Sequence, residues 1–248
     1  QHLNLTLLLS HTHWDHIQGL PFFPPIYQPH CRLRILGYEG ARRGLVNVLT
    51  GQMESPYFPV PFGELPGNIE VEELKDMEFK VGPVRVSAWF ANHPGICVGY
   101  RLETDQGAIA FFPDNEPHCR YEPDGSVQPA RADASLEYAR GQEEKMIEFV
   151  RGVDVLILDA QYDRAEYVRH VGWGHGCVDD VVALAIKAEV KQLFLFHHDP
   201  DHDDAKVESM LTHARRLVAA QNASLLVHAA REGDLVKLAE ISREMAVP

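Results

Sequence analysis

Four metal-binding side chains lie within six consecutive residues near the start of the chain. The segment directly follows the apolar run 5–10 and reads His11-Thr12-His13-Trp14-Asp15-His16. Imidazole nitrogens and carboxylate oxygens are accepted ligands of Zn²⁺, Mn²⁺ and Fe²⁺. If a strand ends near residue 10 and a helix begins near residue 14, the first two histidines face one point and the last two side chains face a second. The spacing therefore predicts that one turn supplies two ligands to each of two metals, whereas a histidine-rich surface turn would need neither the strand nor the acid.

The arrangement H-x-H-x-D-H after an apolar strand resembles the signature of the metallo-β-lactamase superfamily, whose members are hydrolases with an αββα sandwich fold. The resemblance implies three more metal ligands, namely a His at a later strand end, an Asp that bridges two metals, and a final His. His93, Asp114 and His197 occur in this order. Each comes at or just after the C-terminal end of an apolar run, where the sheets of α/β proteins gather their functional groups.

The resemblance also implies how the ligands divide between two cations. One cation is expected to be held by His11, His13 and His93, the other by Asp15, His16 and His197, with Asp114 bridging the two. Because the set has no thiolate, Zn²⁺ is the default cation, and Mn²⁺ and Fe²⁺ are alternatives. A hydroxide between two such cations forms near neutral pH and can attack a substrate. By the same resemblance, Asp15 also acts in catalysis by accepting a hydrogen bond from this nucleophile.

A second pair of residues indicates the kind of bond that is cleaved. Asp159 ends the apolar run 155–158, and His175 lies in the glycine-rich segment 172–176. This is similar to the arrangement in tRNA 3′-processing endonucleases and their small phosphodiesterase relatives, which implies that Asp159 orients His175 toward the scissile phosphate. A carboxylate partner raises the pKa of an imidazole and favours a cation that can donate a proton to a leaving alkoxide. The structural alternative is that His175 opens the next helix and Asp159 belongs to a turn.

The segment 197–204 holds more histidines and acids than one metal site needs. The register of the preceding strand favours His197 as the ligand and directs His198 to the opposite side or to the rim. His202, Asp203 and Asp204 could contact substrate, but either acid could equally cap a helix that begins near residue 205. The sequence leaves the roles of these four residues after His197 open.

The composition restricts the partners of the protein. A formal net charge of −13 gives no general attraction to a polyanion, so we expect a small-molecule substrate and no long nucleic acid. No apolar stretch reaches the length of a membrane-spanning helix, so no membrane partner is expected. The four cysteines have no C-x-x-C spacing and indicate reduced thiols in a cytoplasmic protein. The sequence does not decide between a monomer and a homo-oligomer.

Hydrophobic periodicity and turn residues predict the elements that must position these side chains. Strands are expected at 5–10 (buried), 32–37, 69–74, 78–91, 97–103, 108–112, 153–158, 192–197 and 224–227. Helices are expected at 15–20, 39–50, 135–151, 179–188, 205–220 and after Gly233, with irregular chain at 52–66 and 116–133. Strands that alternate with helices late in the chain fit two sheets covered by helices. The prediction is one α+β domain over residues 1–248, with the four-layer αββα sandwich of the metallo-β-lactamase fold.

The position of the signature departs from the family pattern. It begins 10 residues after Gln1, whereas family members place several strands before it. The domain is therefore expected to be N-terminally incomplete and to lack its usual first strands.

Taken together, these features predict a dinuclear-metal-dependent hydrolase. The pair Asp159 and His175 favours a phosphodiester, and the acidic charge favours a small one, such as a cyclic nucleotide or a cyclic sugar phosphate. Two alternatives stay open: hydrolysis of an ester, lactone or thioester by the same centre, and a metal-binding sensor without turnover. A flavin-linked di-iron protein fits less well, because such relatives replace a ligand of the signature with Glu and carry a flavin domain.

Overall fold

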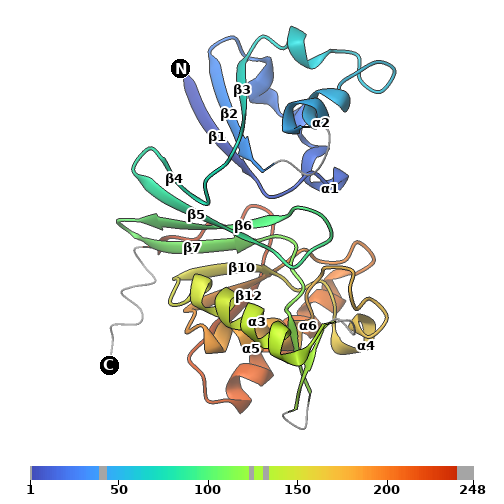
Figure 1. Cartoon of the computed structure of the whole chain (residues 1–248), viewed down its shortest axis with the longest axis vertical. Helices are drawn as coiled ribbons and strands as arrows, with labels where there is room; N and C mark the ends of the chain where they lie inside the picture. Colours follow the sequence, from blue (N-terminus) through green and yellow to red (C-terminus); the bar gives the residue numbers. More distant parts are fainter. Residues whose placement is uncertain (1, 39–43, 123–125, 131–133, 239–248) are drawn as a thin grey trace.

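The computed structural model describes residues 2–38, 44–122, 126–130 and 134–238, which form three sheets and the helices around them (Figure 1). The first sheet has parallel strands in the order β1-β2-β3, which are β1 Leu3–Leu9, β2 Cys31–Gly37 and β3 Asn68–Glu73. Short α-helices and 3₁₀ turns connect them: α1 Trp14–Ile17, η1 Leu20–Phe22, η2 Pro24–Tyr27, α2 Leu45–Gly51 and η3 Phe62–Glu64. Leu33 and Ile35 of β2 share one core with Ile17 and Leu49, so α1 and α2 form the outer layer on this side.

The second sheet has seven strands in the order β12-β11-β10-β7-β6-β5-β4. They are β4 Glu78–Val81, β5 Val84–Phe90, β6 Val98–Thr104, β7 Gly107–Phe112, β10 Val155–Asp159, β11 Gln192–Phe196 and β12 Leu226–Ala229. Strands β4 to β7 form an antiparallel meander, and β7, β10, β11 and β12 are parallel. The helices α3 Leu136–Val150, α5 Val178–Lys187 and α6 Asp204–Ala220 share one core with β10 and β11.

The two larger sheets face each other, and the helices lie outside both (Figure 1). Leu8 of β1 packs against Val86 and Val98 of the second sheet. The hydroxyl of Tyr100, which is buried in β6, donates a hydrogen bond to the carbonyl oxygen of Leu9 at 2.7 Å. The layers therefore follow the order helix, sheet, sheet, helix, and the predicted αββα sandwich is confirmed.

Two predictions about single elements are wrong, and one short helix was missed. The strand expected at 78–91 is a hairpin, because Gly82 takes a positive φ of 56° and reverses the chain between β4 and β5. The segment 116–133, expected to be irregular, contains the hairpin of β8 Cys119–Tyr121 and β9 Val127–Pro129. The one-turn helix α4 Arg164–Tyr167 was not expected, although Asp163 and Glu166 form a capping box at its start.

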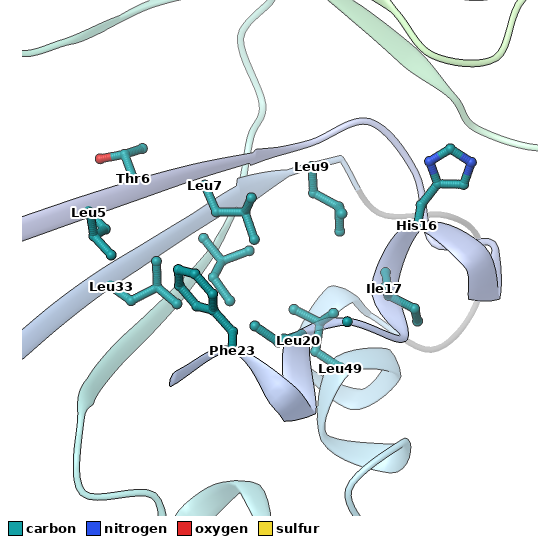
Figure 2. A pocket seen from close by; sticks show the side chains of 12 residues that line it. Leu5, Thr6, Leu7, Leu9, His16, Ile17, Leu20, Phe23, Leu33 and Leu49 are labelled. Atoms are coloured by element: carbon teal, nitrogen blue, oxygen red, sulfur yellow. The ribbon is translucent and has the colours of Figure 1, made fainter. Parts of the chain in front are cut away.

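The burial expected for β1 is also wrong. Leu7 is 38% exposed, and most of β1 is not buried, because among the described strands β1 pairs only with β2 and lies at the edge of its sheet. An apolar cavity of about 340 Å³ runs beside this strand, lined by Leu5, Leu7 and Phe23 among others, with His16 at one end (Figure 2).

Apart from the helices expected at 39–50 and after Gly233, the remaining predicted helices and strands begin and end within about three residues of those observed. The helix expected at 39–50 corresponds to α2, and residues 39–43 lie outside the described residues, as do 123–125 and 131–133. The helix expected after Gly233 falls largely on residues 239–248, which are also outside them. Within the described part of the chain, every helix is too short or too polar to cross a membrane.

Glu143 of α3 is a buried carboxyl group that makes the stability of the fold depend on pH. Its side chain is 2% exposed, and its Oε2 accepts the backbone N–H of His118 at 2.8 Å. Burial raises the pKa of Glu143 from 4.5 to about 7, with Asp180 adding to the shift and Lys187 opposing it. Because the folded state holds this proton more tightly than the unfolded state, the contribution to stability is complete below pH 4.5 and is lost as the pH rises through 7.

Replacing Glu143 by Gln is therefore expected to weaken the pH dependence of unfolding. Between pH 5 and pH 8 the wild-type protein should lose about 2–3 kcal/mol through this group, whereas the amide does not titrate. Urea unfolding at the two pH values measures the difference. Glu144→Gln, at an exposed position of the same helix, is the control. An equal loss of stability in wild type and in Glu143→Gln would contradict the assignment.

Candidate metal centre

The candidate ligands all lie where strands end at one edge of the sandwich. His11 and His13 follow β1, Asp15 and His16 belong to α1, His93 follows β5, Asp114 follows β7, and His197 follows β11. Strands β5, β7 and β11 run in the same direction, so their C-terminal ends meet at the same edge. The first sheet reaches this edge because the N–H of Val98 donates to the carbonyl oxygen of Ser10 at 3.0 Å. The structure thus brings the seven residues into one cluster, and their role as ligands stays a prediction.

One oxygen of Asp114 faces the first group of histidines. Asp114 Oδ2 lies 3.6 Å from Nε2 of His11 and 3.6 Å from Nε2 of His93. Nε2 of His93 lies 3.0 Å from Nδ1 of His13. These four side chains offer ligand atoms that all lie within 4.8 Å of one another, as a single cation requires.

The other oxygen of Asp114 faces the second group. Asp114 Oδ1 lies 2.9 Å from Nε2 of His16 and 3.6 Å from Nε2 of His197. Oδ2 of Asp15 lies 3.1 Å from the same nitrogen of His16 and 3.7 Å from that of His197. Asp114 therefore directs one oxygen to each group, which is the placement that a bridging carboxylate needs.

Burial and charge set the protonation of the innermost residues. His11 and Asp114 are 3% and 2% exposed. Burial lowers the pKa of His11 to about 3 even though Asp114 opposes the shift, so His11 is neutral at neutral pH. Burial alone would raise the pKa of Asp114, but the close rings of His16 and His197 hold it well below its usual range. Neutral imidazole and ionised carboxylate are the states that bind metal.

The donor set fits divalent metal ions, which the metallo-β-lactamase fold implies. Nε2 of His11 and Oδ1 of Asp114 are buried, and among the described residues neither has a partner in hydrogen-bonding geometry. A buried polar atom without a hydrogen-bond partner lowers the stability of the fold by about 1–3 kcal/mol, so two such atoms at one site need an explanation. A cation in each of the two groups would satisfy these atoms, and imidazole with carboxylate suits Zn²⁺, Mn²⁺ or Fe²⁺.

A cysteine lies closer to this cluster than the sequence suggested. Sγ of Cys97, a buried residue, is 3.6 Å from Nδ1 of His11, whereas the Asp114 carboxylate faces the other ring nitrogen, and Sγ is also 3.7 Å from the backbone carbonyl oxygen of Asp114. Burial raises the pKa of the Cys97 thiol well above its usual range, so it stays protonated. Cys97 therefore adds no thiolate to the donor set. None of the four cysteines, all in the described part of the chain, forms a disulfide.

His197 is held in an unusual backbone conformation. Its φ is +58°, in the left-handed region that residues other than Gly seldom adopt. Such a conformation costs on the order of 1–3 kcal/mol and persists where the surroundings require it, often at functional sites. Here it turns the chain directly after β11 and brings the His197 ring against His175, with the ring centroids 4.8 Å apart.

The pair of Asp159 and His175 lies beside the cluster, as the sequence predicted. Asp159 is fully buried, and its Oδ2 lies 2.7 Å from Nδ1 of His175. Its oxygens also accept the backbone N–H groups of Asn115, Gln161 and Gly176 at 3.0–3.2 Å. Burial lowers the pKa of His175, but the hydrogen bond to Asp159 and the negative charges of Asp159, Asp114 and Asp15 together outweigh it and raise that pKa. His175 is not the residue that opens α5, because Cys177 occupies the N-cap position.

The residues after His197 have other partners. His198 Nε2 lies 3.2 Å from the carbonyl oxygen of Ala230, and His202 Nε2 lies 3.1 Å from Glu166. The side chain of Asp203 accepts the N–H of Lys206 and caps α6, and Asp204 is the first residue of that helix. Within the described residues, none of these four joins the clustered ligand groups.

Two residues that follow Asp114 were missed by sequence reasoning. Asn115 Oδ1 accepts the N–H of Asn92 at 3.0 Å, next to His93. Glu116 is 1% exposed and binds the loop that carries His175. The signal in the sequence was the run of three polar side chains directly after an apolar strand, but nothing in it indicated which segments they would reach.

Comparisons with known proteins agree with this arrangement. Residues 5–130, just over half of the chain, match the family described as the beta-lactamase superfamily domain. Over 245 residues the chain is 24% identical to ribonuclease BN of Escherichia coli O6:K15:H31 (strain 536 / UPEC). The alignment covers 86% of this chain and 77% of that protein.

Solved structures share the fold. The metallo-beta-lactamase fold protein YhfI from Bacillus subtilis superposes with a TM-score of 0.61 at 17% identity, over 92% of this chain and 76% of that one. The short form of human tRNase Z superposes with a TM-score of 0.60 at 16% identity, over 94% of this chain and 78% of that one. A diphosphatase from the PhnP family superposes with a TM-score of 0.55 at 18% identity, over 94% of this chain and 72% of that one. This chain therefore belongs to the metallo-β-lactamase superfamily, close to its ribonuclease Z-like branch.

Proposed function

We propose that this superfamily hydrolase cleaves a small phosphodiester and uses two divalent cations. The observation that carries the proposal is the position of His175, which is bonded to the buried carboxylate of Asp159 and stacked on the candidate ligand His197. An imidazole held by a carboxylate beside a cation site can donate a proton to a leaving oxygen. Ester hydrolysis at the same centre would not need this donor to the same degree when the leaving group is weakly basic.

The residues divide into those that bind cations and those that act on the substrate. His11, His13, His93 and Asp114 would hold one cation, and Asp15, His16, His197 and Asp114 the other. The chemistry that such cations supply when bound is Lewis-acid: they offset charge on phosphoryl oxygens and lower the pKa of water. Zn²⁺ is our default, with Mn²⁺ and Fe²⁺ as alternatives.

His175 would act as the general acid. Its Nδ1 is committed to Asp159, so Nε2 is the nitrogen left to hold a proton for the leaving alkoxide. The raised pKa keeps a larger fraction of the ring protonated at neutral pH. Asp15, whose side chain is 60% exposed at the rim, would accept a hydrogen bond from the attacking water. General acid catalysis of this kind contributes about 10²–10⁴-fold.

The proposed substrate is small because the protein is acidic. The sequence relative is a ribonuclease BN, and the structural neighbours include a tRNase Z and a diphosphatase. These names support cleavage of a bond to phosphorus, but they do not fix the size of the substrate. The formal net charge of −13 repels a long polyanion. A cyclic nucleotide or cyclic sugar phosphate carries one phosphodiester charge and avoids most of this repulsion.

The test is an assay of the purified protein, loaded with Zn²⁺ or Mn²⁺, on four substrates. These are bis-p-nitrophenyl phosphate, a cyclic nucleotide, a short RNA with a 3′ extension, and an ester panel. Turnover of the first two that a chelator abolishes would support the proposal. Preferred cleavage of the RNA would overturn the small-substrate part, preferred ester turnover would favour the other hydrolase, and metal binding without any turnover would favour a sensor.

A further inference from the structure

The side chain of Glu116 is a buried acceptor on which three donors converge, one from the end of α4 and two from the loop that follows it. It is 1% exposed and accepts a hydrogen bond from the hydroxyl of Tyr167. It also accepts the backbone N–H of Gly172 at 2.9 Å and that of Gly174 at 3.1 Å. Burial and the neighbouring Glu116 raise the pKa of Tyr167, so its hydroxyl stays protonated and can donate. A buried acceptor with three donors is strongly bound in place.

The loop that Glu116 binds has little regular structure of its own. It lies between α4, which ends at Tyr167, and α5, which begins at Val178. Gly172 and Gly174 have φ values of +85° and +89°, a conformation that residues with a side chain rarely adopt. Between them the Trp173 side chain is 59% exposed and so adds little burial. The two N–H groups that flank Trp173 both donate to Glu116, which makes this carboxyl group a principal constraint on the loop.

The loop in turn fixes the ring of His93. The carbonyl oxygen of Gly174 lies 3.0 Å from Nδ1 of His93, and a Cβ on Gly174 would collide with that ring. When Nδ1 donates its proton to this carbonyl, Nε2 is left as the unprotonated nitrogen that faces Asp114 and His13. Partners of this kind, which hold the second nitrogen of a ligating His, set its tautomer and orientation and raise its basicity.

The backbone of Glu116 holds the other side of the same histidine. Its N–H donates to the carbonyl oxygen of Asn92 at 3.0 Å, and the Asn92 side-chain amide donates to the Glu116 carbonyl oxygen at 2.8 Å. Asn92 immediately precedes His93. Glu116 therefore connects the chain before His93 to the loop that receives the His93 ring, two residues after the candidate bridging ligand Asp114.

We propose that Glu116 is a positioning residue of the metal centre, which holds the Gly174 carbonyl against His93 and thereby sets the affinity of that site for its cation. The proposal rests on the metal centre proposed above. Glu116 itself touches neither the cation nor the substrate. It acts through Gly174. The Gly174 N–H donates to Glu116, and the Gly174 carbonyl oxygen, in the next peptide group of the loop, faces His93.

The test compares two buried carboxyl-to-amide substitutions. Gln has one acceptor oxygen and an amide nitrogen that only donates, so Glu116→Gln replaces charge-assisted hydrogen bonds by weaker neutral ones. In addition, either a glycine N–H faces the amide nitrogen or the Tyr167 hydroxyl must turn to accept from it. Glu143→Gln is the matched control, because Glu143 is 2% exposed and accepts the backbone N–H of His118, away from this loop. Zn²⁺ affinity is measured by competition with a chromophoric chelator. We expect Glu116→Gln to weaken binding at one of the two sites about 10–100-fold and Glu143→Gln to leave it unchanged.

A second variant and a second measurement keep the proposal separate from loss of fold. Tyr167→Phe removes one donor and leaves both N–H bonds, so it should weaken Zn²⁺ binding less than Glu116→Gln does. Amide hydrogen exchange of the metal-free proteins should show faster exchange over residues 170–176 in Glu116→Gln and wild-type exchange there in Glu143→Gln.

Three results would decide the matter. Unchanged Zn²⁺ affinity and unchanged loop exchange in Glu116→Gln would overturn the proposal, and so would equal weakening in Glu116→Gln and Glu143→Gln. If the wild-type protein failed to bind Zn²⁺, the metal centre and the proposed function would fall. The loop exchange of the metal-free proteins would still show whether Glu116 holds the loop.

Discussion

Replacement of Asp114 by Ala is expected to release bound metal and to lower phosphodiester turnover about a thousandfold or more. Among the described residues, Asp114 is the carboxylate that reaches both histidine groups, since Oδ2 is 3.6 Å from Nε2 of His11 and Oδ1 is 2.9 Å from Nε2 of His16. Without it, each proposed cation loses a negatively charged ligand and the two sites lose their connection. Metal ions supply several kcal/mol of transition-state stabilisation, and about 1.4 kcal/mol corresponds to a tenfold change in rate.

Metal content after dialysis and kcat/KM on a cyclic nucleotide measure the effect. The matched control is Asp154→Ala, because Asp154 is a buried carboxyl group at the opposite end of β10 that pairs with Lys191 at 2.6 Å. That variant should lose stability and keep both metal content and turnover. A protein that kept its metals and its activity after Asp114→Ala would contradict the proposed centre.

Replacement of His175 by Ala is expected to lower turnover about 10²–10⁴-fold while the metal content stays near that of wild type. His175 is bonded through Nδ1 to Asp159, and the proposal assigns its other nitrogen to the leaving group. The loss should therefore depend on the substrate. It should be large when an alkoxide leaves, as from a cyclic nucleotide, and small when p-nitrophenolate leaves, because a weakly basic leaving group needs little protonation.

The two substrates and the metal content together distinguish a general acid from a metal ligand at position 175. His175 also lies within ligand distance of Asp114 and His197, so loss of metal in His175→Ala would assign it to the cation instead. Asp159→Asn should lower turnover in the same substrate-dependent way, since it removes the carboxylate that orients the ring. His213→Ala is the control, because His213 lies on α6, away from the cluster, and its side chain is 46% exposed. An equal loss of activity on both substrates would contradict the role of general acid.

Much of the candidate site could be predicted from the sequence because its residues lie at positions with local signals. His11, Asp15 and His16 are neighbours in one hexapeptide, and Asp114 and His197 follow apolar runs that are strands in the structure. Since β7 and β11 run in the same direction, residues at their C-terminal ends must meet at one edge. Their positions at strand ends, together with the resemblance to the family, were therefore enough to predict which ones meet.

The details of the elements were less predictable where pairing between distant strands decides them. The apolar run of β1 has the composition of a buried strand, but its burial depends on neighbours, and β1 pairs only with β2 in the described residues. The hairpin of β8 and β9 does carry a strong turn signal, Pro-Asp-Gly at 123–125, but the short segments on either side of it are polar and indicated irregular chain. In both cases the local pattern gave the wrong environment because tertiary contacts override local propensity.

The sequence by itself determined the family and which candidate ligands come together, because these depend on short spacings and strand ends. Only the tertiary structure decided how the ligands are oriented. It placed one oxygen of Asp114 toward each histidine group, and it joined Glu116 to a loop that lies more than fifty residues further along the chain. The physical reason is that side-chain direction and hydrogen-bond partners depend on which segments pack together. Residue spacing along the chain does not carry that information.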